Sequence, residues 1–183
     1  MAKFHILRPL NEKLCELMLY IADQSLSDRA FGAVKLNKLL WYIDVEAYRK
    51  LGRTITGAEY RHLQEGPAPP ANKARDYLVS VGRAEVQRIP TGKKDQERLV
   101  PKQPPKEELF TSEELRLARG IIEKYWNENG TSLSNKTHKE YPYRLTKEKQ
   151  VIPWELTLIS TEPPTKKQIE MGRTIAQKRG LAV

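Results

Sequence analysis

The sequence predicts an α+β fold that is mainly helical: a single compact domain of about five to seven helices with a small β-hairpin. Three observations favour this fold class. Apolar residues recur at helical spacing in several separate segments, two short β-prone runs flank one turn, and a threonine–glutamate pair with capping-box spacing opens a later helix. With 183 residues, such a domain can bury a sizeable core without a disulfide or a metal.

The first two helices are expected from Asn11 to about Gln24 and from about Val34 to Leu51. Asn11 is a suitable N-cap, and Gly52 is placed to end the second helix as a C′ glycine does. Apolar side chains keep the helical period in both segments, at Leu14, Leu17, Met18 and Ile21 in the first and at Leu36, Leu39, Leu40, Ile43 and Ala47 in the second.

The middle of the chain alternates extended and helical segments. Residues 58–63 form a short extended piece, and the three prolines of 66–70 exclude a regular helix or a central strand, because proline fixes φ and lacks an N–H donor. A helix is expected at 71–81. The β-prone runs 84–89 and 96–100, which are separated by a turn-rich stretch, predict the hairpin.

The next helix begins at the capping box of Thr111 and Glu114, and Gly130 is expected to end it. A short helix is expected at 132–138, followed by irregular or partly extended chain over 141–159. We expect residues 1–160 to form the main domain.

The remaining residues, 161–183, are expected to form a C-terminal helix and a basic tail, packed on the domain or extending from it. This last helix opens with the capping-box spacing of Thr165 and Gln168 and runs to about Lys178.

Composition narrows the class of protein. The one cysteine, Cys15, excludes an intramolecular disulfide and is expected to be a buried, inert thiol beside an apolar helix face. No apolar run approaches the roughly 20 residues that span a bilayer, and nothing near Met1 is typical of a signal peptide, so a cytoplasmic protein is expected. The net charge of +9 favours acidic partners, nucleic acid included, or simply keeps the protein in solution.

The second helix carries the first candidate binding surface. Lys35, Lys38, Tyr42 and Arg49 lie near one helical stripe beside the apolar stripe, and Trp41 lies between the two. An aromatic side chain flanked by cations is typical of a protein-binding hot spot. The alternative is a solvated face whose aromatic rings lie under their neighbours.

The second candidate is the loop that contains Gly66, Pro67, Pro69 and Pro70. Glycine permits the turn and the prolines make it rigid, so an exposed loop of this kind would lose little entropy on binding. The alternative is a tight structural corner.

Catalytic and metal sites have weak support. Ser134, His138 and Glu140 could be drawn as a triad, but no nucleophile-elbow pattern surrounds them. We expect His138 instead to hydrogen-bond a backbone group and to fix the turn into 141–143. Histidines and Cys15 lack metal-ligand spacing, and the glycines form no phosphate-binding loop, so neither a metal nor another cofactor is expected.

Several segments, in this order and spacing, resemble the Panacea domain of the SocA-like antitoxin family. They are KLNKLLWYIDVEAY (35–48), LGRTITGAEY (51–60), EGP (65–67), LSNKTHKEYPY (133–143) and VIPWEL (151–156). The matched motif positions include Thr137, His138, Pro142, Tyr143, Pro153 and Trp154. Asn37, Lys136 and the proline-rich 68–70 depart from the family pattern.

The resemblance implies a non-enzymatic antitoxin of a bacterial or phage toxin–antitoxin system that neutralises a toxin encoded nearby by direct contact. One lineage of the family instead acts as an adaptor that delivers its toxin to an ATP-dependent protease, which would add a protease as partner. A nucleic-acid-binding regulator is the alternative from another class, although no helix-turn-helix is visible. The oligomeric state is open between monomer and dimer.

Overall fold

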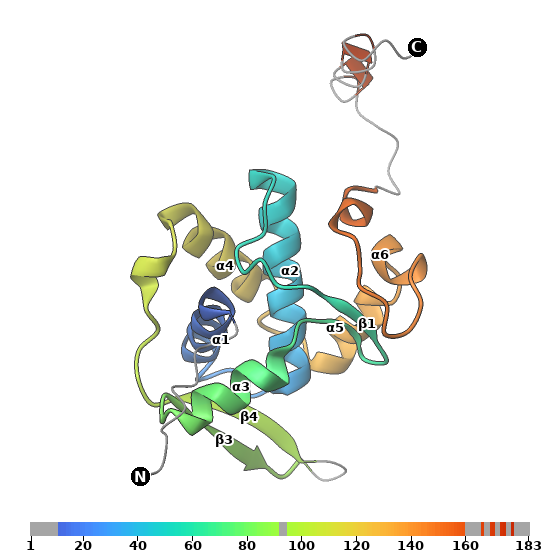
Figure 1. The fold of residues 1–183 in the computed structure, drawn as a ribbon. Coiled ribbons are helices and arrows are strands. Elements are labelled where there is room, and N and C mark those ends of the chain that lie inside the picture. The colour runs from blue at the N-terminus through green and yellow to red at the C-terminus, as the bar shows by residue number, and fades with distance from the viewer. Residues whose placement is uncertain are drawn as a thin grey trace, which may run out of the picture.

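A computed structural model describes residues 11–91 and 95–159, together with positions 166, 169, 170, 173, 174 and 177 (Figure 1). The elements, in chain order, are α1 (Glu12–Gln24), α2 (Ala33–Leu51), β1 (Arg61–Leu63), β2 (Gly66–Ala68), α3 (Ala71–Ser80), β3 (Ala84–Ile89), β4 (Gln96–Pro101), the 3-10 helix η1 (Glu107–Leu109), α4 (Ser112–Lys124), α5 (Gly130–Thr137), α6 (Tyr141–Arg144) and the 3-10 helix η2 (Trp154–Leu158). This confirms the α+β, mainly helical fold class.

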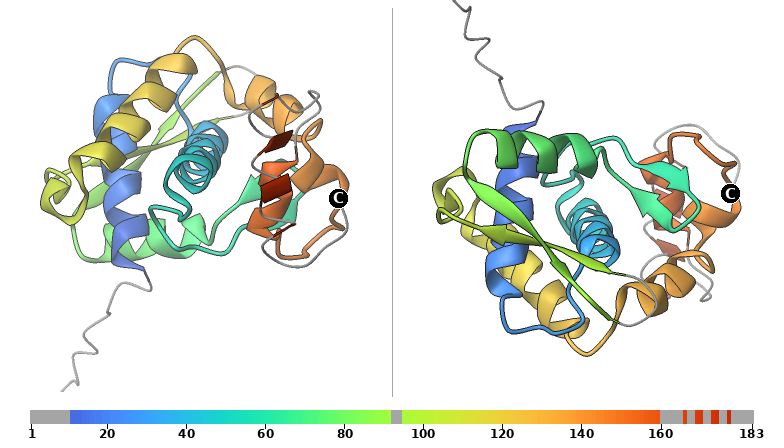
Figure 2. Two further views of the ribbon diagram at one scale, coloured as in Figure 1. Left: turned by 90° about the horizontal axis from the view of Figure 1, so that it is seen from above. Right: turned by 90° about the horizontal axis from the view of Figure 1, so that it is seen from below.

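Helix α2 lies at the centre of the domain. Viewed from above and below it is seen nearly end-on, with the other elements arranged around it (Figure 2). It contacts α1, α4, α5, β2, β4 and η2, so neighbours cover it on several sides. Gly52 ends it in the left-handed conformation at φ 70°, as expected. A helix surrounded in this way also buries many of the polar side chains that its sequence carries.

Helices α1 and α4 begin at the predicted caps. The Asn11 side chain accepts a hydrogen bond from the Leu14 amide at 2.9 Å. Thr111 and Glu114 form both halves of the capping box that opens α4. The Glu114 carboxylate is fully buried and also pairs with Lys13 at 3.1 Å and with Arg53 at 2.6 Å. The cap therefore also joins α4 to α1 and to the segment that follows α2.

The expected end of α4 is wrong. The helix stops at Lys124, and Gly130 is instead the first residue of α5. A Cβ atom at Gly130 would lie 2.9 Å from the Cβ of Val34 on α2. The glycine therefore allows the close approach of two helices, which its place in the sequence did not indicate.

Each sheet of the described chain is an antiparallel pair. Strands β3 and β4 form the predicted hairpin, with Ala84 opposite Pro101 and Ile89 opposite Gln96. Strands β1 and β2 form a second hairpin, with Arg61 opposite Ala68, where the sequence predicts an extended piece followed by a loop. Strand β1 also bridges to Val151, but β2 is an edge strand, which is why Pro67 is tolerated in it.

The segment 141–159 is more regular than expected. It contains α6 and η2, and between them the chain runs beside β1: the Gln150 carbonyl accepts from the His62 amide at 2.9 Å, and the Ile152 amide donates to the Tyr60 carbonyl at 2.8 Å. The six described positions from 166 to 177 are helical, while the rest of the predicted last helix lies outside the described residues. No helix in the described part of the chain is both long and apolar enough to cross a membrane.

Candidate functional site

Lys38, in the middle of α2, is the most unusual of the candidate residues. Its side chain is 1% exposed, and the ammonium group donates a hydrogen bond to the Pro67 carbonyl at 2.8 Å. Burial lowers the pKa of Lys38 to about 7, although the nearby carboxylates of Glu65 and Glu140 raise it. Among the described residues, no carboxylate forms an ion pair with this lysine.

Gly66 and Pro67 lie directly against this lysine. Gly66 has a φ of +97°, and a Cβ atom at this position would lie 2.8 Å from the Lys38 ammonium nitrogen and would also overlap the Thr137 hydroxyl. Only glycine fits both the backbone conformation and the space. Pro67 has no N–H, and its carbonyl is used by Lys38. The two residues therefore form the turn as one unit with α2.

Side chains from α5 and α6 hold the same turn from the other side. The Ser134 hydroxyl donates to the Glu65 carbonyl at 2.5 Å, and the Tyr143 hydroxyl donates to the Leu63 carbonyl at 3.2 Å. We call this meeting point of α2, the β1–β2 turn, α5 and α6 the junction; its residues are Lys38, Glu65, Gly66, Pro67, Ser134, Thr137 and Tyr143.

Two histidines stack on Tyr143 at the margin of the junction. The ring of His62 lies 3.6 Å from that of Tyr143, and the ring of His138 lies 4.4 Å from it. The expected backbone hydrogen bond of His138 is not formed at Nε2, which is buried without a partner among the described residues. Stacking therefore positions His138. Burial, followed by the proximity of His138, lowers the pKa of His62, a residue that belongs to none of the motifs in the sequence.

Glu140 accepts a hydrogen bond from the Trp41 indole at 3.1 Å, and burial raises the pKa of its carboxyl group. Because Ser134 bonds the Glu65 carbonyl and His138 stacks on a tyrosine, none of the hydrogen bonds in the described chain links Ser134, His138 and Glu140 as a catalytic triad. No group of three or more histidine, cysteine, aspartate or glutamate residues within the described ranges could hold a metal ion.

Trp41 and Trp154 form the centre of an aromatic cluster. Trp41 is fully buried, and its ring stacks on Trp154 at 5.6 Å, with Tyr60 lying 5.3 Å from each of the two. Pro153 comes directly before η2, which carries Trp154. The 151–156 motif is therefore what covers this side of α2.

The expected exposure of the α2 candidate surface is wrong for four of its five residues, although the buried rings of Trp41 and Tyr42 agree with the alternative in which aromatic rings lie under their neighbours. Lys35, Lys38, Trp41 and Tyr42 are all buried. Lys35 pairs with Asp28 at 2.6 Å and donates to the Trp126 carbonyl at 2.8 Å, and the ring of Tyr42 lies 4.6 Å from that of Tyr125. Periodicity along α2 identifies its stripes, but does not indicate how many neighbours cover them.

Arg49 is the exposed member of the stripe, and its guanidinium donates two hydrogen bonds to the Thr157 carbonyl, at 2.9 and 2.6 Å. It fastens η2 to α2. The expectation of an exposed proline loop is also wrong, because Gly66, Pro67 and Pro69 are buried and only Pro70 is exposed. The structural-corner alternative describes this loop.

A second buried polar group on α2 orders the chain that leads into β1. The Asp44 carboxylate accepts hydrogen bonds from the Ile55 amide at 2.8 Å, the Thr56 amide at 3.0 Å, the Thr56 hydroxyl at 2.5 Å and the Tyr60 hydroxyl at 2.9 Å. Burial raises the pKa of Asp44, and these donors oppose the shift.

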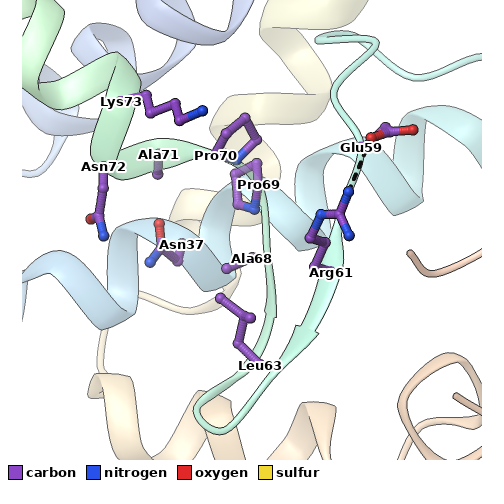
Figure 3. Close-up of a pocket in the computed structure, with 10 residues that line it drawn as sticks. All are labelled: Asn37, Glu59, Arg61, Leu63, Ala68, Pro69, Pro70, Ala71, Asn72 and Lys73. Atoms are coloured by element: carbon purple, nitrogen blue, oxygen red, sulfur yellow. Dashed lines mark ion pairs between the residues drawn. The ribbon is translucent and has the colours of Figure 1, made fainter. Parts of the chain in front are cut away.

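Two adjoining cavities open beside the junction. The first, of about 450 Å³, is lined by residues from α2, β1 and the start of α3 (Figure 3). The second, of about 220 Å³, shares Asn37, Leu63 and Ala68 with it and reaches Lys38. The junction therefore has an accessible side, although the candidate residues themselves are mostly interior.

Comparison with known proteins identifies one family. A protein-family model described as "Antitoxin SocA-like, Panacea domain" matches residues 36–143, which include Lys38, the Gly66–Pro67 turn, Ser134, Thr137, His138 and Tyr143. No curated protein and no solved structure matches the chain. Because the match covers more than half of the 183 residues, the chain belongs to the SocA-like antitoxin family that is defined by the Panacea domain.

Proposed function

We propose that this protein is an antitoxin that neutralises a cognate toxin, encoded by the adjacent gene, through direct protein–protein contact in the cytoplasm. The observation that carries the proposal is the family match over 36–143. In the described chain the motif residues build a turn and fill a core, and the hydrogen bonds of Ser134, His138 and Glu140 do not form a nucleophile–base pair.

The first experiment is co-expression. The adjacent gene is induced in the presence or absence of this chain, and growth is followed together with co-purification of the two proteins. The antitoxin proposal expects growth to be arrested by the adjacent gene alone, restored by co-expression, and accompanied by a complex that survives size-exclusion chromatography. Arrest that co-expression does not relieve would contradict it.

The same strains separate the alternatives. A protease adaptor would lower the level of the toxin only in cells that contain the ATP-dependent protease, whereas a neutralising antitoxin works in protease-deficient cells as well. A nucleic-acid-binding regulator, which the net charge of +9 favours, would shift operon DNA with a steep dependence on salt and would not bind the adjacent gene product.

Variants of Trp41 or Lys38 do not by themselves test partner contact, because both side chains are 0–1% exposed and their loss would also disturb the core. Informative substitutions lie on exposed residues around the junction.

A further inference from the structure

The two cavities beside the junction form one groove along the N-terminal half of α2. They share Asn37, Leu63 and Ala68, so the floor and one wall are continuous from the start of α3 to the β1–β2 turn. We call this the α2 groove and define it by Asn37, Lys38, Arg61, Leu63, Ala68 and Lys73. Its residues come from α2, the hairpin and α3 (Figure 3).

Polar donors without acidic partners line its floor. The Lys38 ammonium has three N–H donors, and its one hydrogen bond within the described chain goes to the Pro67 carbonyl. The amide of Asn37 lies on the same wall, one residue earlier on α2, and makes no hydrogen bond to a described residue. Lys38 is 1% exposed, so a carboxylate that reached it would be shielded from water.

The start of α3 adds partial positive charge at one end. Pro70 is the N-cap and provides no side-chain hydrogen bond, and the first turn has no acidic residue. The first-turn amides of Asn72 and Lys73 have no acceptor in the described chain. The side chains of Arg61 and Lys73 are exposed on the rim of the groove.

Acidic groups near the groove are few: Glu140 acts electrostatically on Lys38 at the floor, and the others are placed towards the ends. Glu59 is 72% exposed and lies 3.8 Å from Arg61, a separation at which a surface pair is weak. Glu65 lies at the β1–β2 turn, where a third cavity begins that also contains Asp95 and Glu97 together with Lys35 and Arg88. Positive groups therefore occupy the α3 end and the floor, while charges of both signs lie beyond the turn.

We propose that the α2 groove binds an extended acidic segment of the partner toxin, whose carboxylates contact Lys38 and Asn37 on the floor and Arg61 and Lys73 on the rim. Leu63, which is 40% exposed on the wall, provides an apolar contact for the same segment. The choice of an acidic occupant comes from charge complementarity. This inference rests on the proposed antitoxin function and assigns the binding surface.

The test measures binding of the full chain to the purified product of the adjacent gene. The groove variants are Lys73→Glu and Arg61→Glu. Lys147→Glu is the control for the first, because Lys147 is also exposed and its side chain has no partner in the described chain. Arg116→Glu is the control for the second, because Arg116 is exposed on α4 beside Glu113, as Arg61 lies beside Glu59.

Each groove variant is expected to raise Kd about tenfold and to flatten its dependence on salt, whereas the controls stay within about twofold of the original protein. Thermal unfolding of all four variants verifies that they are folded. A toxin variant in which an acidic residue is replaced by lysine should restore binding to Lys73→Glu, which a general loss of stability would not allow.

Lys38 provides a second readout, because its pKa of about 7 leaves it largely neutral at pH 8. A carboxylate bound beside it raises that pKa, so complex formation takes up protons. Glu65 from the hairpin turn and Glu140 from the N-cap of α6 already face it in the free protein, and its pKa of about 7 includes their effect. Calorimetry at pH 8 in two buffers of different ionisation enthalpy should therefore detect uptake, and no uptake would overturn the Lys38 contact.

The outcomes separate the two proposals. If the toxin binds but Lys73→Glu and Arg61→Glu behave like their controls, the groove assignment fails and the antitoxin function stands. If the original protein binds no product of the adjacent gene, both fail.

Discussion

The two hairpins of this domain are held in place by different means. Strands β3 and β4 are six residues long, pair along their whole length, and pack on α1 and α3. Arg98 of β4 adds hydrogen bonds to the carbonyls of Phe31 and Leu26, at 3.2 and 3.1 Å, so this hairpin combines a full ladder with long-range contacts. Strands β1 and β2 have three residues each and are fixed from elsewhere, by main-chain hydrogen bonds from residues 149–152 to β1 and by the side chains of Lys38 on α2, Ser134 on α5 and Tyr143 on α6.

The difference separates local from long-range determination of structure. Two neighbouring β-prone runs are enough to predict the β3–β4 hairpin from the sequence. The β1–β2 hairpin depends on contacts that span 29, 69 and 80 residues of sequence. Several family motif residues lie at the β1–β2 hairpin. The motif residues there are therefore the ones that make its tertiary contacts. Four predictions test this contrast, from the largest expected effect to the smallest.

Gly66→Ala should destabilise the protein most. The left-handed backbone alone costs a non-glycine residue about 1–2 kcal/mol, and the overlap with Lys38 and Thr137 adds about 1–3 kcal/mol of overpacking. Gly82, which precedes β3, has a φ of +72° with no atom within 4 Å of the added Cβ, so Gly82→Ala is the matched control. Urea unfolding should show the larger loss for Gly66→Ala. Equal losses in the free energy of unfolding would mean that the close contacts of Gly66 with Lys38 and Thr137 do not restrict this turn.

Asp44→Ala should follow, because it leaves buried donors of Ile55, Thr56 and Tyr60 without their acceptor. We expect a loss of about 2–4 kcal/mol in the free energy of unfolding. Glu46→Ala removes a carboxylate two residues along the same helix that pairs with Lys50 and is 30% exposed. That control should cost less than about 0.5 kcal/mol, and a similar loss in both variants would argue against an ordering role for Asp44.

Lys38→Met should change how stability depends on pH. The amine has a pKa of about 7 in the folded chain against its usual 10.5. Between these values the unfolded chain binds more protons, so Lys38 makes the free energy of unfolding rise with pH, by at most about 1.4 kcal/mol per pH unit. Urea unfolding at pH 7, 8 and 9 gives the free energy of unfolding at each pH, and this free energy should rise less steeply with pH in the variant. Parallel curves would show that Lys38 is charged throughout this range.

Arg75→Ala should have the smallest effect. The guanidinium joins α3 to β4 by an ion pair with Glu97 at 3.1 Å, but both side chains are partly exposed. A change of at most about 0.5 kcal/mol is expected because water competes for such pairs. A loss above about 1 kcal/mol would show that this pair contributes more than a surface ion pair to holding α3 against β4.

Much of the fold could be predicted from local sequence. Asn11 and the Thr111–Glu114 pair mark helix starts, Gly52 marks a helix end, and the separation of two β-prone runs indicates the β3–β4 hairpin. In each case the stabilising partners lie within a few residues, so the pattern contains the information.

The site could be predicted in its members but not in its arrangement. Lys38, Gly66, Pro67 and Tyr143 were all selected, yet Lys38 was expected on a surface, since burying an ammonium group is costly. The acceptor of the Lys38 ammonium group is the backbone carbonyl of Pro67. Every residue has such a carbonyl, so the sequence does not indicate which one Lys38 contacts. His62 has no motif around it and is noticeable only once Tyr143 lies against it.

The contact between Lys38 and Pro67 also affects how the hairpin meets other chains. In so short a strand, the middle residue of β2 presents the main-chain groups that face away from β1. Pro67 has no N–H group, and its carbonyl already accepts the hydrogen bond from Lys38. An additional strand would find no ladder to extend, so this margin is protected against intermolecular sheet growth and aggregation.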